Sequence, residues 1–352
     1  MAGPADTAGT AETAGTAETA GTAETAGTAD GVADVAGIAG VAGVAGVAEA
    51  VRYRPLLFSI AYGMTGSVGD AEDLVQDAFL GLTRAGRAGT EVTDPKAYLA
   101  TTVTRLGINH LTSARVRRET YVGEWLPEPV VAFADRPGGP AEHAELADTL
   151  SMAFLLMLEA LSPAERAVFL LREAFGYGYP QVAEMTGKSE ANCRQIFARA
   201  RKRLAPGPGG RPARERATAR RTEGDELARR FFAATEGGDL EALLDLLAPD
   251  VVFHGDGGGK ARAVGRSVSG LRRVAQLLLF GFGRNRELGI SRRYARVNGR
   301  PGAVLLDARG RVAGVIALDI ADGAVRAFHS VSNPDKLAHL GPVSDLGLRP
   351  RR

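Results

Sequence analysis

Two stretches rich in proline and glycine divide this chain and limit what it can fold into. One spans residues 122–142, "VGEWLPEPVVAFADRPGGPAE", and the other spans residues 206–221, "PGPGGRPARERATARR". Proline has no amide hydrogen and its ring clashes with the preceding helical turn, so neither stretch continues a helix. The 352 residues also suffice for two or three separate cores. The sequence therefore predicts folded segments at 51–121, 145–205 and 224–341, linkers at 122–144 and 206–223, and a tail at 342–352.

The first 50 residues form a low-complexity region. The unit TAGTAE occurs at 7–12, 13–18 and 19–24, and triplets of the type Val-Ala-Gly follow. Such small side chains bury too little apolar surface to offset the entropy of an ordered chain, so we expect residues 1–50 to be disordered. They hold seven acidic residues and no lysine or arginine, so the net charge of +2 hides a basic remainder.

Hydropathy and cysteine content favour a cytoplasmic protein. No stretch has the ~20 consecutive apolar residues that a membrane helix requires. Cys193 is the only cysteine, which excludes an intrachain disulfide and suits a reducing compartment. We therefore expect the protein in the cytoplasm.

The first folded segment predicts two long helices. Residues 67–82 place their apolar side chains on one side at helical spacing, with Asp70, Asp73 and Asp77 on the other. Residues 94–119 begin with Asp94 as N-cap and a proline at the first helical position, and end in a basic cluster. The apolar side consists of Ala71, Leu74, Val75, Ala78, Phe79 and Leu82, and the basic cluster of Arg115, Arg117 and Arg118.

The second folded segment has the pattern of a helix-turn-helix. One helix starts at Ser162, and a short one at 179–187 is ended by Gly187, which suits the turn before a helix at 189–203. Asn, Gln and Arg side chains make paired hydrogen bonds to base edges, and cations contact phosphates. The pattern therefore predicts DNA reading by the last helix, although a solvated basic helix end is the alternative. Val182, Ala183, Cys193 and Ile196 would face inward; Ser189, Glu190, Asn192, Arg194, Gln195 and Arg199 outward; Arg201, Lys202 and Arg203 towards phosphates.

The role of Cys193 has two interpretations. Its place on the inward side of the last helix favours a small core residue over a redox sensor.

The third folded segment predicts an α+β domain. Its helical patterns cover residues 225–236, 239–247 and 267–280. Short turns such as "NGRPG", "ARG" and "ADG" separate the last four strand patterns, as in a meander. We therefore expect a curved antiparallel sheet with helices, its strands at 251–254, 289–297, 303–307, 312–319 and 324–331.

Four side chains of this third segment are candidates for acid–base chemistry: His254, Asp256, Asp319 and His329. Two histidines and scattered carboxylates do not by themselves define a catalytic site. Ordinary core or rim histidines are the alternative. The run "DGGGK" at 256–260 lacks the GxxxxGK[ST] spacing of a phosphate-binding loop, because Ala261 follows the lysine.

The two helical segments together resemble a bacterial sigma-70-type initiation factor of the extracytoplasmic function class. Residues 53–80, "YRPLLFSIAYGMTGSVGDAEDLVQDAFL", resemble regions 2.1–2.2, and residues 97–119, "AYLATTVTRLGINHLTSARVRRE", resemble regions 2.3–2.4. Residues 161–204, "LSPAERAVFLLREAFGYGYPQVAEMTGKSEANCRQIFARARKRL", resemble region 4. The resemblance covers most of residues 51–205 and implies a helical region 2 and a helix-turn-helix region 4.

Three further stretches resemble the signatures of a sigma subgroup with a fused SnoaL-like C-terminal domain. They are "WLPEP" at 125–129, "DGGGK" at 256–260 and "NPDKL" at 333–337. The resemblance implies a cone-shaped α+β fold for the third segment. It also implies interdomain regulatory contacts by Trp125, Leu126, Pro127, Asp256, Gly257, Gly258, Gly259, Lys260, Asn333, Pro334, Asp335, Lys336 and Leu337.

The resemblance assigns partners to the helical segments. Core RNA polymerase, through the β′ clamp helices and the β subunit, and promoter DNA are implied, with no separate anti-sigma protein, membrane, cofactor or metal required. The function implied is promoter-specific transcription initiation controlled in cis, without enzyme activity. The polymerase contacts would be Asp73, Gln76 and Phe79; the −10 contacts Arg105, Asn109, Arg115, Arg117 and Arg118; the −35 contacts Ser189, Asn192, Arg194, Gln195, Arg199, Arg201 and Lys202.

Some positions depart from the family pattern. Asn109, His110 and Thr112 stand where Asp and Arg are common, which favours weaker promoter melting or a shifted −10 preference. Two other functions remain open from the residues alone. One is a conventional helix-turn-helix regulator, and the other is a SnoaL-like enzyme tethered to DNA-binding helices.

Overall fold

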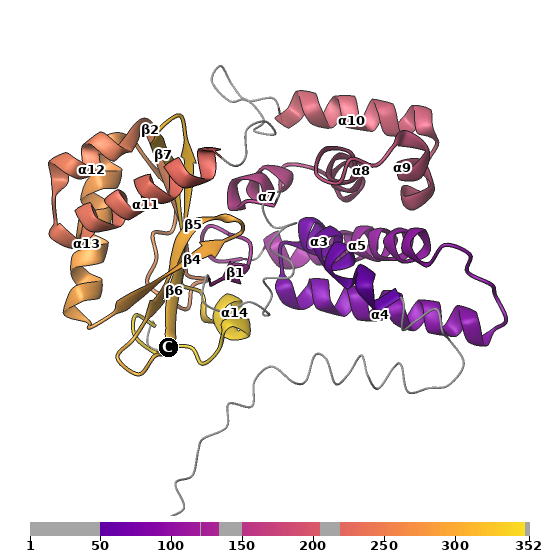
Figure 1. Cartoon of the computed structure of the whole chain (residues 1–352), viewed down its shortest axis with the longest axis horizontal. Helices are drawn as coiled ribbons and strands as arrows, with labels where there is room; N and C mark the ends of the chain where they lie inside the picture. Colours follow the sequence, from indigo (N-terminus) through magenta and orange to yellow (C-terminus); the bar gives the residue numbers. More distant parts are fainter. Residues whose placement is uncertain (1–49, 120, 134–149, 205–218, 349–352) are drawn as a thin grey trace, which may run out of the picture. The chain divides into compact units, whose positions relative to one another are not determined.

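The computed structural model describes residues 50–119, 121–133, 150–204 and 219–348 (Figure 1). In the helix that ends at residue 119, side chains are described up to residue 113. In the helix that begins at residue 219, they are described from residue 222 onward. The disorder expected before residue 50 and most of the basic linker after Ala205 lie outside these residues. None of the helices in the described part of the chain is both long and apolar enough to span a bilayer.

The first folded segment consists of three packed helices. A single 3₁₀ turn, η1 (Val51–Tyr53), leads into α3 (Arg54–Thr65), which packs against α4 (Val68–Arg87) and α5 (Pro95–Glu119). The Ser67 hydroxyl caps α4 by accepting from the Asp70 amide, and the Asp94 carboxylate caps α5 by accepting from the Ala97 amide. The predicted apolar side of α4 is the buried one, so both predicted helices are confirmed.

The second folded segment contains α7 (Met152–Leu158), α8 (Pro163–Glu173), α9 (Tyr179–Thr186) and α10 (Glu190–Leu204). Ser162 and Glu165 form the capping box that starts α8. Gly187 has a φ of 65° between α9 and α10, which glycine adopts without strain. The predicted helix-turn-helix is therefore present, and it lies against the first segment because α5 contacts both α8 and α9.

The third folded segment contributes six strands to a seven-stranded sheet and packs three helices against it. The strand order is β1-β4-β5-β6-β7-β2-β3, and β4 to β7 form the predicted antiparallel meander. However, β2 pairs with β7 in parallel, so the sheet is mixed and the expectation of a wholly antiparallel sheet was wrong. The strands are β1 (Val131–Ala132), β2 (Leu247–Asp256), β3 (Val268–Ser269), β4 (Ser291–Val297), β5 (Arg300–Leu306), β6 (Val312–Ala321) and β7 (Ala324–Val331).

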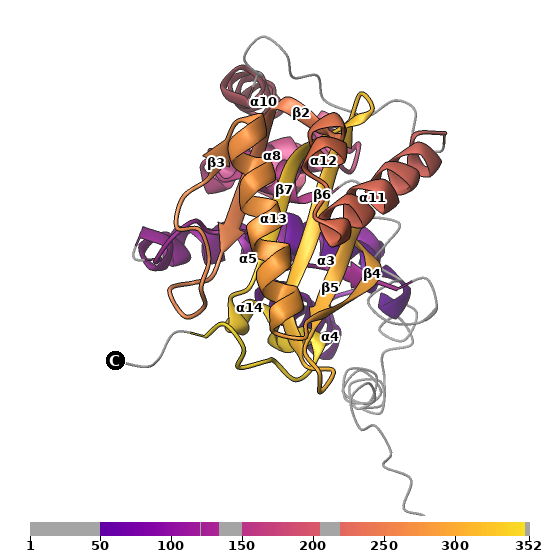
Figure 2. The ribbon, with the colours of Figure 1, turned by 90° about the vertical axis from the view of Figure 1, so that its left-hand side faces the viewer.

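The two faces of this sheet are covered differently. Helices α11 (Ala219–Gly237), α12 (Leu240–Leu246) and α13 (Leu271–Glu287) cover one face and build an apolar core that includes Phe231 and Phe328 (Figure 2). The opposite face buries side chains from outside the domain, among them Leu126 and Met152. It is also covered by α14 (Pro334–Leu337), which the turn η3 (Ala338–Leu340) follows.

The linker after residue 121 is therefore part of the C-terminal sheet and not a free connection between the two helical segments. Its residues Val131 and Ala132 form β1 and pair with Val297 and Arg296 of β4. The linker thus docks on this sheet.

Other boundaries also differ from the predicted ones. The helix expected at 267–280 begins at Leu271, because Val268 and Ser269 pair with β2. The first helix of the domain begins at Ala219 rather than at residue 225, so the basic linker is shorter than expected. Strands of two residues, such as β1 and β3, are too short to show an alternating pattern.

Candidate interdomain and nucleic-acid sites

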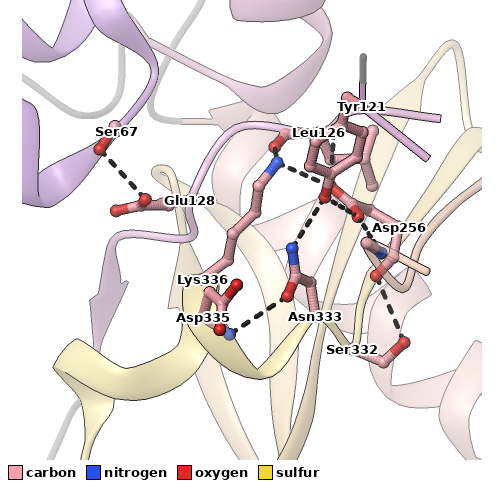
Figure 3. A network of polar contacts seen from close by, with 10 residues as sticks. Ser67, Tyr121, Leu126, Glu128, Asp256, Ser332, Asn333, Asp335 and Lys336 are labelled. Atoms are coloured by element: carbon pink, nitrogen blue, oxygen red, sulfur yellow. Dashed lines mark hydrogen bonds and ion pairs between the residues drawn. The ribbon is translucent and has the colours of Figure 1, made fainter. Parts of the chain in front are cut away.

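The three signature stretches meet at the carboxylate of Asp256, which is 0% exposed (Figure 3). Its Oδ2 accepts hydrogen bonds from the Leu126 amide at 2.8 Å and from the Lys336 ammonium at 2.7 Å. Its Oδ1 accepts from the Tyr121 hydroxyl and, at 2.9 Å, from the Gly258 amide. One buried side chain thus joins the linker, the glycine-rich turn and the segment after β7.

Lys336 supplies the opposite charge and is itself only 6% exposed. Its ammonium also donates to the Leu126 carbonyl oxygen, and it lies 4.3 Å from the ring centre of Trp125 and 4.8 Å from that of Tyr121. A buried cation is tolerated when a carboxylate, a carbonyl and aromatic faces replace its water. Burial and the hydrogen bond to Asp256 raise the pKa of the Tyr121 hydroxyl, so it remains a neutral donor.

The glycines of "DGGGK" permit a close approach between segments. Gly258 has a φ of 56°, and a Cβ added there would lie 2.3 Å from Nδ2 of Asn333. A Cβ on Gly259 would lie 3.0 Å from the side chain of Val122. Asn333 caps α14 and donates to the Tyr121 hydroxyl, while Lys260 pairs with Asp335 at 2.6 Å on the surface. The space beside Gly258 and Gly259 is thus filled by the side chains of Asn333 and Val122.

The structure therefore brings the expected regulatory residues together around the linker. Pro127 and Leu337 are buried with them, and Pro334 opens α14.

The far end of the linker holds the start of α4. The Glu128 carboxylate accepts from the Ser67 hydroxyl at 3.1 Å and from the Val68 amide at 2.6 Å. The Glu128 amide donates to the Gly66 carbonyl at 2.8 Å. A carboxylate at a helix N-terminus is stabilised by unpaired amides and the helix dipole. Glu128 was not among the predicted site residues, although it lies within "WLPEP", and only its place beside α4 gives it this role.

The predicted polymerase contacts fall into two groups. Asp73 and Gln76 are exposed on α4. Phe79 is only 6% exposed and lies among the buried apolar residues of the same helix. Because a buried ring contributes to the core, the expectation that Phe79 contacts a partner directly disagrees with its position in this structure.

The predicted −10 residues lie along α5, and one of them is engaged by the helix-turn-helix. Arg105 Nη2 donates to the Glu184 carbonyl at 2.8 Å, and its Nε donates to the Met185 carbonyl at 3.4 Å. A hollow of about 410 Å³ lies beside this contact, lined among others by Tyr98 and Asn109. The side chains of Arg115, Arg117 and Arg118 lie outside the described residues.

Two of the positions that depart from the family pattern make local contacts. His110 Nε2 lies 3.3 Å from a carboxylate oxygen of Asp70, and the Thr112 hydroxyl donates to the Ile108 carbonyl at 2.8 Å.

The predicted −35 residues are exposed along α10. Ser189, Asn192, Arg194, Gln195, Arg199, Arg201 and Lys202 all face outward, whereas Cys193 and Ile196 are buried as expected. Ala183 is only half-buried.

Ion pairs and an aromatic ring hold part of α10. Arg194 pairs with Glu190 at 2.9 Å and lies over the Tyr179 ring at 5.0 Å. Arg203 pairs with Glu165 at 2.8 Å. Burial acts to raise the pKa of Glu165, but hydrogen bonds from Ser162 and the charges of Arg203 and Arg199 lower it on balance. The start of α8 is thereby tied to the end of α10.

Both histidines among the acid–base candidates pair with carboxylates, His254 with Glu124 of the linker and His329 with Asp319 of the third segment. Nδ1 of His254 lies 2.6 Å from the Glu124 carboxylate, Nε2 of His329 lies 2.7 Å from Asp319, and the two imidazoles stack at 5.0 Å. Burial acts to raise the pKa of Asp319, but the hydrogen bond and charge of His329 lower it. Both carboxylate oxygens of Asp256 accept hydrogen bonds within the interdomain network described above. No cluster of three His, Cys, Asp or Glu side chains suited to a metal occurs within the described ranges.

Comparison with known proteins matches all three segments. Models of sigma-70 region 2, sigma-70 region 4 and the SnoaL-like domain match residues 50–117, 151–204 and 228–332. The ECF RNA polymerase sigma factor SigJ of Mycobacterium tuberculosis is 38% identical over 307 residues, which are 82% of this chain and 91% of SigJ. The probable ECF sigma factor SigI of the same species is 33% identical over 290 residues, 81% of this chain and 92% of SigI.

The fold agrees with the sequence comparison. The crystal structure of M. tuberculosis SigJ matches with a TM-score of 0.66 at 35% identity, covering 85% of this chain and 100% of that chain. Both named relatives are initiation factors for RNA polymerase, so neither the conventional-regulator nor the tethered-enzyme alternative is retained. The chain belongs to the extracytoplasmic function RNA polymerase sigma factors that carry a SnoaL-like domain.

Proposed function

We propose that the SnoaL-like domain controls promoter-specific initiation in cis, so that no separate anti-sigma protein is required. The observation that carries this proposal is the buried network of Asp256 and Lys336 with the Leu126 backbone. Through it the domain holds the linker that joins regions 2 and 4. Because the linker also caps α4 through Glu128, release of the network would free region 2 as well.

The sign of the control follows from Arg105. Its guanidinium donates to two carbonyl groups at the end of α9, so a side chain expected at the −10 element is held by region 4. Promoter DNA has to compete with this contact. We therefore expect the packed arrangement to limit initiation, and loosening of the domain contacts to increase it.

Roles in this proposal follow the exposed positions of α4, α5 and α10 and, for Arg115, Arg117 and Arg118, whose side chains lie outside the described residues, the family resemblance alone. Asp73 and Gln76 of α4 bind the β′ clamp helices, while Arg105, Asn109, Arg115, Arg117 and Arg118 act at the −10 element. The exposed residues of α10 act at the −35 element, with Asn192 and Gln195 on bases and Arg201 and Lys202 on phosphates. Core polymerase and chromosomal DNA share the cytoplasm, so the protein would act there.

A pair of glycine substitutions tests the control. Gly258→Ala places a methyl group on the Asn333 side chain and strains a positive φ, whereas Gly265→Ala in the same loop meets nothing within 4 Å. Run-off transcription with core polymerase, on the upstream region of the protein's own gene, should increase several-fold for Gly258→Ala. Gly265→Ala should match the unsubstituted chain.

Equal output from both variants, at equal protein concentration and with intact helical content, would contradict control in cis. A chain that binds the promoter duplex yet gives no transcript with core polymerase would contradict the assigned polymerase contacts.

A further inference from the structure

The β4–β5 hairpin ends in a two-residue turn, Asn298–Gly299. Both residues have positive φ values, 50° and 70°, which is the geometry that an Asn-Gly hairpin turn adopts. This turn chemistry explains an asparagine here without any further role. It does not explain why the side chain is 0% exposed, since residues at the tip of a hairpin normally face solvent.

The buried amide of Asn298 contacts three different parts of the chain. Its Nδ2 donates to the Tyr62 hydroxyl at 2.8 Å and to the Leu150 carbonyl at 3.0 Å. Its Oδ1 accepts from the backbone amide of Val130 at 3.1 Å. The backbone amide of Asn298 in turn donates to the Val130 carbonyl at 2.8 Å. Tyr62 belongs to region 2, Val130 to the linker, and Leu150 directly precedes region 4.

Tyr62 extends this set of hydrogen bonds. Its hydroxyl donates to the Glu128 carbonyl at 2.6 Å, and its side chain is 1% exposed. Burial raises the pKa of Tyr62, and the hydrogen bond from Asn298 only partly opposes this. The hydroxyl therefore stays neutral and uses both its hydrogen and a lone pair.

Only an amide satisfies this position. It needs two donors, for a hydroxyl oxygen and a carbonyl, and one acceptor, for a backbone amide, on the same planar group. An aspartate would present an oxygen to the Leu150 carbonyl, and glycine would leave all three partners without this contact. Buried polar groups that lose their partners carry the full cost of desolvation.

We propose that Asn298 is a positioning residue that fixes region 2 and the start of region 4 to the SnoaL-like domain. It lies outside all three signature stretches, so it forms a second attachment besides the Asp256–Lys336 network. This inference rests on the proposed control in cis. It names one residue through which the SnoaL-like domain contacts both DNA-binding regions. Loss of the amide loosens the packed arrangement and increases initiation.

The protein provides a matched control turn. Asp322–Gly323, between β6 and β7, has φ values of 52° and 74°, and the exposed Asp322 side chain pairs with Arg326 at 3.1 Å. Asn298→Gly and Asp322→Gly therefore remove one side chain each from turns of the same backbone geometry. Tyr62→Phe removes only the hydroxyl that Asn298 contacts.

The experiment is run-off transcription with core polymerase and the full chain. Asn298→Gly should raise output by up to roughly tenfold, equivalent to about 1.4 kcal/mol, while Asp322→Gly leaves it unchanged. Tyr62→Phe should also raise output, and the double variant Asn298→Gly with Tyr62→Phe should add less than the two single effects. Dyes on Asp77→Cys in α4 and Ala191→Cys in α10 should report a larger separation only for the Asn298 and Tyr62 variants.

Equal behaviour of the two glycine variants in output and dye separation would overturn the proposal, as would fully additive Asn298 and Tyr62 effects. If Asn298→Gly fails to fold, Tyr62→Phe with the dye pair decides alone, because it keeps the turn intact. An effect of Gly258→Ala without one of Asn298→Gly removes only this inference. Absence of both effects removes control in cis as well.

Discussion

At the scale of single residues, Lys336 and Asp256 hold opposite charges in a place from which water is nearly excluded. Removal of one partner leaves the other charge buried, which costs far more than the pair contributes by itself. Their stretches were recognised in the sequence, but the distance of 2.7 Å between them was not foreseeable, because 80 residues separate the two.

Lys336→Met is expected to destabilise the full chain by about 3–5 kcal/mol, since it leaves the Asp256 carboxylate without its cation. The double variant with Asp256→Asn should recover part of this loss, because no charge then remains buried. Urea unfolding followed by circular dichroism checks both. A double variant as unstable as the sum of the single variants would contradict the ion pair as its cause.

Asp307 predicts a pH dependence of stability. Desolvation acts to raise its pKa, but hydrogen bonds from Ser344 and from the Arg311 and Arg309 amides lower it well below the usual value. A group whose pKa is lowered in the folded state stabilises the folded protein at pH values above its unfolded pKa of about 3.9. This contribution is lost as the pH falls through the pKa of the folded state. Asp307→Asn should therefore lower the melting temperature at pH 7, and the difference should shrink below about pH 4.

The matching control is Asp250→Asn, whose carboxylate is exposed and pairs only loosely with Arg326, at 3.3 Å. Thermal unfolding of the three chains between pH 3 and pH 8 makes the comparison. A deficit of Asp307→Asn that grows towards low pH would contradict the sign of the effect.

Phe79 and Asn298 show why some residue roles were missed. Helical spacing placed Phe79 on the apolar side of α4 while the family resemblance placed it on a partner, and burial decides for the core. Asn298 reads as an ordinary turn residue in "NGRPG", because its partners lie up to 236 residues away.

At the scale of elements, length decided what could be predicted. The helices α4, α5 and α8 to α10 have caps and periodic apolar sides that local sequence specifies. The meander β4 to β7 followed from its turns. The two-residue strands β1 and β3 and the parallel pairing of β2 with β7 depend on contacts between distant segments, which no local pattern contains.

The recognition helix α10 supports a prediction that separates its two kinds of contact. Lys202→Ala should weaken holoenzyme binding to all duplexes and reduce the salt slope by about 1. Gln195→Ala should cost about 1–3 kcal/mol on the cognate −35 element only. Titration of labelled promoters at several salt concentrations measures both.

Arg203→Ala is a useful comparison, because Arg203 already pairs with Glu165 within the protein. It should change the salt slope less than Lys202→Ala. A Gln195→Ala variant that weakens every duplex equally would contradict base reading by that side chain.

At the scale of the whole chain, the family and its three parts were predictable, whereas their connection was not. The linker seemed to separate regions 2 and 4, but it forms an edge strand of the C-terminal sheet and contributes Leu126 to its core. Tyr121 and Asn298 contribute to this connection through side chains outside the signature stretches, and Glu128 through a side chain of WLPEP that had no predicted role. Their roles depend on the docking of complete domains, which composition and spacing do not encode.

The order of synthesis gives the docked linker a further consequence. Leu126 leaves the ribosome 210 residues before Lys336, which binds its carbonyl group. At about 5–20 residues per second, this interval lasts roughly 10–40 s. For the later part of that interval, once α10 is complete at Leu204, both promoter-binding regions are present in the nascent chain without the SnoaL-like domain. Under the proposed control, each new molecule therefore passes through an unrestrained form before Lys336 is made.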